Sequence, residues 1–136
     1  SFPTRRSSDL LQCGAVASSI AHDSHNLIVA GTNDADMVLA GNTVRKNKGG
    51  LAFALNGQVV GELPLPVAGL MSTESAETVE EKLQALKAAL KAHGISEDID
   101  AFMTLAFVSL PVIPKLRLNT YGIVDVDAQQ IVPAVF

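Results

Sequence analysis

The sequence has few aromatic residues, a single cysteine and no long hydrophobic run. Aromatic residues make up 4% of its 136 residues and hydrophobic residues 48%, so we expect a core of Ala, Val, Leu and Ile. Cys13 has no second cysteine for an internal disulfide, which suits a reducing cytoplasm. No apolar run reaches the roughly 18 residues that span a bilayer, so we expect no transmembrane segment.

A basic excess is also lacking, since the formal net charge is −4 at pH 7. An acidic chain without a basic stripe is a poor binder of nucleic acid or of an anionic membrane surface, and we expect neither as a partner. The sequence shows no internal repeat, low-complexity tract or linker. We therefore expect one domain that is large enough to bury a core.

The first ten residues, SFPTRRSSDL, have no periodic apolar pattern. The codons TCT TTC CCT ACA CGA CGC TCT TCC GAT, followed by CT and any base, encode this peptide, and the string is that of a common short-read sequencing adapter. We interpret residues 1–10 as an adapter-derived arm that is not native, and we exclude them from the fold. The natural domain is then expected over residues 11–136, as the C-terminal part of a longer chain.

Apolar runs and turn residues predict an α+β fold, a layered sandwich of strands with flanking helices. Asn33 offers an N-cap to one helix, and Asn56-Gly57 is a dipeptide typical of a tight hairpin. Residues 101–110 do not decide between helix and strand, and Pro111 and Pro114 predict an extended passage after them. The predicted strands are 14–21, 27–32 (buried), 122–126 and 131–136, and the predicted helices are 33–48 and 74–93.

The loop AHDSHN gathers His22, Asp23, Ser24, His25 and Asn26 between two predicted strands. A catalytic Ser–His–Asp set is disfavoured, because neighbours on a short loop cannot easily align nucleophile, base and orienting group. His22, Asp23 and His25 are competent metal ligands, but their spacing matches no recognised metal motif. The loop could instead hydrogen-bond a small polar ligand, or form a turn in which Asp23, Ser24 and Asn26 bond to local backbone.

Three blocks carry a resemblance to a known family: GAVASSIAHDSHNLIVAGTNDADM, GELPLPVAGLMS and FMTLAFVSLPVIPKLRLNTYGIVDV. In this order they resemble the C-terminal domain of bacterial adenine deaminases, which are metal-dependent amidohydrolases. The resemblance covers nearly the whole chain from Gly14 onward. It implies an enzyme of purine salvage that converts adenine and water to hypoxanthine and ammonia.

The same resemblance implies partners that this chain does not contain. A preceding TIM-like barrel would hold a binuclear Mn²⁺ or Fe²⁺ site and bind adenine, in a cytoplasmic homo-oligomer. This domain would cap the barrel and present His22, Asp23, Ser24, His25 and Asn26 to the active site, with no catalytic residue assigned here. Without the barrel the chain is expected to be inactive. The alternative is a purely structural or dimerisation domain.

Overall fold

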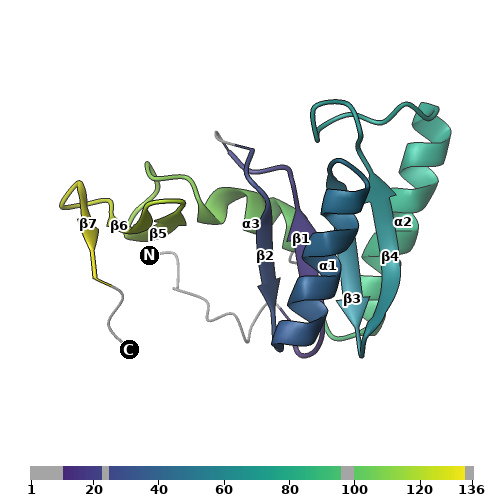
Figure 1. Cartoon of the computed structure of the whole chain (residues 1–136), viewed down its shortest axis with the longest axis horizontal. Coiled ribbons are helices and arrows are strands. Elements are labelled where there is room, and N and C mark those ends of the chain that lie inside the picture. Colours follow the sequence, from purple (N-terminus) through teal and green to yellow (C-terminus); the bar gives the residue numbers. More distant parts are fainter. Residues whose placement is uncertain (1–10, 23–24, 96–99, 134–136) are drawn as a thin grey trace.

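A four-stranded antiparallel sheet forms the middle layer of the computed structural model, which describes residues 11–22, 25–95 and 100–133 (Figure 1). Its strands lie side by side in the order β2 (Ile28–Gly31), β1 (Ala15–Ser18), β3 (Gly50–Leu55) and β4 (Gln58–Pro64). β2 is thus an edge strand, and its four residues are half-buried. The prediction of a buried strand at 27–32 was wrong in burial, because β2 has a neighbour on one side only.

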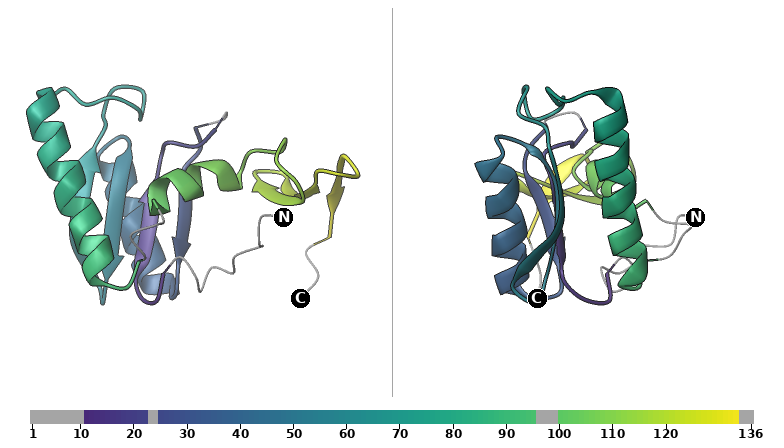
Figure 2. Two further views of the ribbon diagram at one scale, coloured as in Figure 1. Left: turned by 180° about the vertical axis from the view of Figure 1, so that it is seen from behind. Right: turned by 90° about the vertical axis from the view of Figure 1, so that its right-hand side faces the viewer.

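Helices cover both faces of this sheet. α1 (Asp34–Lys46) packs on one face, and α2 (Ala76–Ala92) and α3 (Ala101–Val108) pack on the other (Figure 2). Figure 2 shows the sheet edge-on between these two helical layers. The predicted α+β sandwich with flanking helices is confirmed.

The two faces of the sheet carry side chains of different size. Since side chains alternate along a strand, Val16 and Phe53 pack with Leu86 and Leu90 of α2, while their neighbours turn the other way. The face toward α1 is lined by Ala15, Ala17, Ala52 and Ala54, which cluster with Ala40 and Val44 of α1. Alanines let α1 lie close to the strands, so a core with few aromatic residues suffices on that face.

The hairpin β3–β4 forms at the predicted dipeptide, where Asn56 (φ 51°) and Gly57 (φ 75°) both have the positive φ of this turn. Asn33 caps α1 as predicted, because its side-chain oxygen accepts the Asp36 N–H at 2.9 Å. Asp36 is itself buried, and its carboxylate accepts the N–H groups of Asn56 (3.1 Å) and Gly57 (2.8 Å). This single side chain therefore fixes the hairpin turn to the start of α1.

Residues 101–110, which the sequence left undecided, begin as the helix α3. The carboxylate of Asp100 caps it by accepting the N–H groups of Phe102 (3.1 Å) and Met103 (3.0 Å). Asp100 also pairs with Lys87 of α2 at 3.0 Å, which ties the two helices together. α2 confirms the helix predicted at 74–93, with Ser75 as its N-cap.

A second, three-stranded antiparallel sheet follows α3 in the order β5 (Leu116–Asn119), β6 (Gly122–Asp125) and β7 (Gln130–Val132). Figures 1 and 2 show it at one end of the molecule, beyond α3 and apart from the four-stranded sheet. One core was expected for the domain, whereas β5–β7 form a separate sheet. Of the strand predicted at 131–136, the structure describes only the part to 133, and β7 ends at Val132.

Several expectations fall outside the described residues. They are the adapter-derived arm at 1–10, the loop residues Asp23 and Ser24, and the last three residues of the predicted strand 131–136. Among the residues that the structure describes, no helix is both long enough and apolar enough to cross a bilayer.

Candidate functional site

The polar loop at 22–26 connects the paired strands β1 and β2. Ser18 pairs with Ile28 at the end of this ladder, so the loop follows the strands at one end of the four-stranded sheet. The hairpin turn at Asn56 lies at the opposite end of the strands, because β3 pairs antiparallel with β1. Of the five candidate residues, His22, His25 and Asn26 are described.

His22 is fastened to the C-terminal end of α3. Its backbone N–H donates to the carbonyl of Ala106 at 3.0 Å, and the Ser109 hydroxyl donates to the His22 carbonyl at 3.3 Å. Its ring stacks on Phe107, with centroids 4.9 Å apart and planes at 22°. Because the last carbonyls of a helix lack partners within the helix, the first bond satisfies α3 while it fixes the loop.

His25 lies in a left-handed conformation, with φ of 48°. This region is uncommon for residues other than glycine, although His, Asn and Asp enter it more often than most. Its N–H donates to the Ala21 carbonyl at 2.7 Å. The side chains of His22 and His25 are exposed, with ring centroids 6.3 Å apart, and Asn26 is half-buried. The two imidazoles can donate and accept hydrogen bonds on the open side of the loop.

A second loop, at 65–71, is hydrogen-bonded to Ser19 at the same end of the sheet. The Ser19 hydroxyl donates to the Gly69 carbonyl at 2.5 Å and accepts the Gly50 N–H at 2.8 Å. Ala68 and Gly69 both have positive φ, and Val67 pairs with Met71 across the loop. This loop is therefore bound to the segment that leads from β1 into the histidines.

The metal interpretation of His22, Asp23 and His25 stays a prediction, because one of these three residues lies outside the described part of the chain. Within residues 11–22, 25–95 and 100–133, no three His, Cys, Asp or Glu side chains are grouped so that they could hold a metal ion. Asp23 lies outside these residues. The described residues alone do not assemble a binuclear metal centre.

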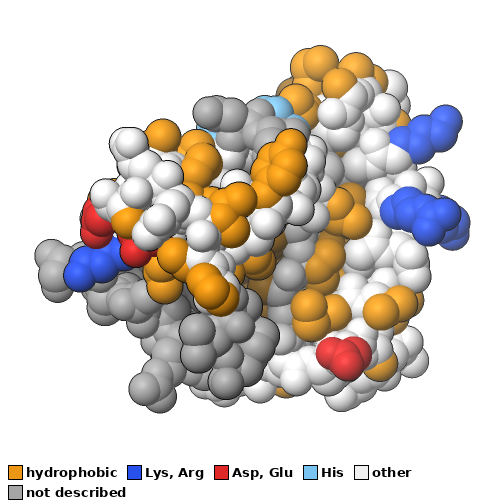
Figure 3. All heavy atoms as spheres, turned by 60° about the vertical axis from the view of Figure 1, so that its left-hand side comes forward, with side chains coloured by type: hydrophobic (Ala, Val, Ile, Leu, Met, Phe, Trp, Pro, Cys, Tyr) orange, Lys and Arg blue, Asp and Glu red, His pale blue; other side chains and the backbone are white. Residues whose placement is uncertain are grey.

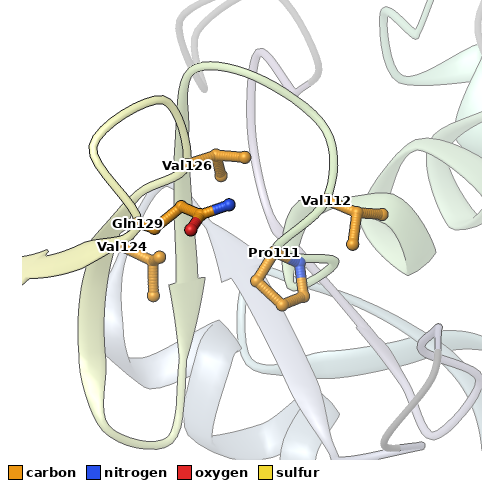
Figure 4. Close-up of a pocket in the computed structure, with 5 residues that line it drawn as sticks. All are labelled: Pro111, Val112, Val124, Val126 and Gln129. Atoms are coloured by element: carbon orange, nitrogen blue, oxygen red, sulfur yellow. The ribbon is translucent and has the colours of Figure 1, made fainter.

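A pocket of about 440 Å³ lies between the passage after α3 and the small sheet (Figure 4). It is lined by Pro111, Val112, Val124, Val126 and Gln129. Figure 4 shows one amide and otherwise aliphatic or proline side chains around it. With no ionisable group in its lining, this pocket offers no acid, base or nucleophile.

Comparison with known proteins identifies the family. The model of the adenine deaminase C-terminal domain matches residues 9–130. Adenine deaminase 2 of Carboxydothermus hydrogenoformans is 50% identical over 123 residues, which cover 90% of this chain and 22% of that protein. The adenine deaminase of Kosmotoga olearia is 56% identical over 116 residues (85% and 20%), and that of Bacillus velezensis 46% over 123 (90% and 21%).

This chain belongs to the adenine deaminase C-terminal domain family. It spans about a fifth of the length of the curated relatives that it matches. The resemblance seen in the sequence is therefore confirmed at the level of the family.

In this family member, the three sequence blocks that carried the resemblance meet at one end of the four-stranded sheet. The first block supplies the histidine loop, the second supplies the loop bound through Ser19 to Gly69, and the third supplies the α3 carbonyl bound by His22. Sequence reasoning missed Phe107 and Ser109 as supports of the site. They lie more than 80 residues from His22, and no local signal pairs them with it.

Proposed function

We propose that this chain is the C-terminal domain of a longer adenine deaminase, which hydrolyses adenine to hypoxanthine and ammonia in cytoplasmic purine salvage. The observation that carries the proposal is identity near 50% to proteins named adenine deaminase over 85–90% of this chain. Because the match covers only about a fifth of those proteins, we place the metal pair, Mn²⁺ or Fe²⁺, and most of the adenine pocket in the preceding part. The isolated chain should release no ammonia from adenine.

Within that enzyme, we propose that the loop of His22, Asp23, Ser24, His25 and Asn26 faces the active site. The His22 N–H is bound by the end of α3 and the His25 N–H by Ala21, while both described histidines are exposed. A loop that is anchored through hydrogen bonds and exposes donors and acceptors suits recognition of a purine edge, because polar groups left unpaired by a wrong ligand penalise that ligand strongly.

A structural or dimerisation role is the second candidate. It is favoured by the bonds between His22 and Ala106 and between Ser109 and His22, which by themselves only join the loop to α3. In that case the imidazoles contribute nothing to turnover. The two candidates differ in what the loss of the His25 side chain does.

The test uses a chimera in which this chain replaces the matching segment of the Carboxydothermus hydrogenoformans relative. His25→Asn removes the imidazole but keeps a residue that tolerates positive φ, so the fold is preserved. We expect kcat/KM on adenine to fall roughly a hundredfold, as for loss of one transition-state contact. The melting temperature should move little.

Asn56→Ala is the matched control, since Asn56 also has positive φ but lies at the opposite end of the sheet from the histidine loop. It should lower the melting temperature and leave kcat/KM unchanged. If His25→Asn behaves in the same way, with normal metal content, the structural role is the correct one. A chimera that binds metal and is folded but inactive contradicts the deaminase assignment itself.

A further inference from the structure

Apolar side chains remain exposed at the end of the molecule that carries α3 and the small sheet. On α3, Met103 and Phe107 lie one turn apart on the outer face, opposite the buried Phe102 and Leu105. Figure 3 looks onto this side and shows hydrophobic side chains spread across it, with charged side chains mainly toward its margins. Exposed apolar area of this kind marks an interaction surface.

The small sheet adds an apolar face, on which Leu116 and Leu118 are exposed while Ile123 and Val132 are half-buried. Leu118 pairs with Ile123, which pairs in turn with Val132, so these three side chains share one face, together with Leu116 two residues away. Leu116 and Leu118 are 52% and 57% exposed. Asp125, opposite Leu116, is the acidic residue of this face.

The small sheet can gain stability from a partner. Its strands are four, four and three residues long, and the apolar face of a sheet is stabilised when it packs against another layer. Among the residues that the structure describes, the helices make their main contacts with the four-stranded sheet. The apolar face of β5–β7 is thus left for a partner to cover.

The surface is continuous with the candidate site. Phe107, which is 37% exposed, stacks on the ring of His22, so the histidine loop stands at the margin of the apolar surface. A partner that covers this surface would meet the loop as well. This favours a partner that needs the loop.

We infer that the part of the longer relatives that precedes the matched segment docks on the surface made by Met103, Phe107, Leu116, Leu118, Ile123 and Val132. The inference rests on the proposed function for the identity of the partner. About four fifths of each relative lies outside the match, which is ample chain to supply an apolar layer. Docking there brings the histidine loop to the junction between the two parts.

Hydrogen exchange tests the surface in the chimera described above, against this chain alone. The exchange rates of the β5–β7 amides should be at least about tenfold lower in the chimera, because a covering layer suppresses local opening. Amides of α1 should not change. Leu118→Glu should abolish the added protection, whereas Val38→Glu, at a 62% exposed position on α1, should not.

A second format needs no folded chimera. The unmatched part of the relative is produced with an affinity tag together with this chain, and the amount of chain that co-purifies is measured. Leu118→Glu should lower this amount about tenfold or more, since a buried unpaired charge opposes association, and Val38→Glu should leave it unchanged.

The outcomes separate the two proposals. If the chimera is active but β5–β7 gain no protection, the docking surface is wrong and the deaminase assignment stands. If the chimera is folded and β5–β7 are protected but it is inactive, the deaminase assignment is wrong and the docking surface stands. If this chain alone is a dimer that Leu118→Glu converts to monomer, the surface belongs to a second copy and the inference is wrong.

Discussion

The four-stranded sheet and the three-stranded sheet use similar alternating residues with opposite results. In the first, helices cover both faces, and Phe53 and Leu86 are 0% and 1% exposed. In the second, Leu116 and Leu118 alternate with polar residues yet stay more than half exposed. Alternation selects which side chains share a face, but only a covering layer converts that face into a core.

The largest expected difference concerns single side chains of the two regions. Phe53→Ala should lower the free energy of unfolding by about 3–5 kcal/mol, because it leaves a cavity in a closed core. Leu118→Ala should change it by less than about 0.5 kcal/mol in the isolated chain, as an exposed residue does. Urea unfolding of both variants makes the comparison, and equal losses would show that the small sheet has a core of its own.

The two sheets should also differ in how often they open locally. In the isolated chain, amides of β5–β7 should exchange roughly a hundredfold faster than those of β1 and β3, since local openings of uncovered elements require less free energy than global unfolding. Mass spectrometry after timed deuterium labelling measures both rates in one sample. Equal protection in the two sheets would remove the contrast on which the docking surface is argued.

Acid should act on the four-stranded region through Asp36. Its hydrogen bonds from the Asn33 side chain and the Gly57 N–H, with that of Asn56, outweigh burial and lower the pKa of this carboxyl. A lowered pKa stabilises the fold fully above the unfolded value of about 3.9, and this stabilisation is lost as the pH falls through the lower folded value.

The wild-type chain should therefore be more stable than Asp36→Asn at pH 7, and the difference should shrink as the pH is lowered below about 4. Melting temperatures of both proteins from pH 7 to pH 2.5 measure it. A difference that is constant over this range would mean that the charge of Asp36 contributes nothing.

The smallest expected effect on the free energy of unfolding concerns two side chains that accept backbone N–H groups, one in each region. The Ser75 hydroxyl accepts the Thr78 N–H at the start of α2, and the Asn119 side chain accepts the Tyr121 and Gly122 N–H groups in the small sheet. Ser75→Ala should lower the free energy of unfolding by about 1 kcal/mol. Asn119→Ala should leave the main unfolding midpoint unchanged, unless the two sheets unfold as one unit.

The sequence predicted the elements whose signals are local. Asn33 caps a helix through a residue three positions away, and Asn56-Gly57 forms its turn by itself. Residues 76–92 repeat apolar side chains at helical spacing. In each case the residues that decide the structure lie within one turn of one another, so the sequence shows them together.

What the sequence did not predict depends on distant residues. The bonds of Asp36 to Asn56 and Gly57 link segments about 20 residues apart, so no local pattern indicates them. The support of His22 by Phe107 and Ser109 spans more than 80 residues. The five-residue loop was recognised as a candidate site, yet its first residue, His22, is bound by α3, which the sequence did not distinguish from a strand.

The bond from His22 to Ala106 also bears on the order of folding. The hairpin β3–β4 joins neighbouring residues, so it can form early, whereas the histidine loop reaches its final geometry only after α3 has closed a loop of more than 80 residues. Contacts between distant residues form slowly, because the entropy of loop closure must be overcome first. We expect the candidate site to be the last part of the four-stranded region to become ordered, and a chain that stops before α3 to keep the hairpin and lose the fixed histidines.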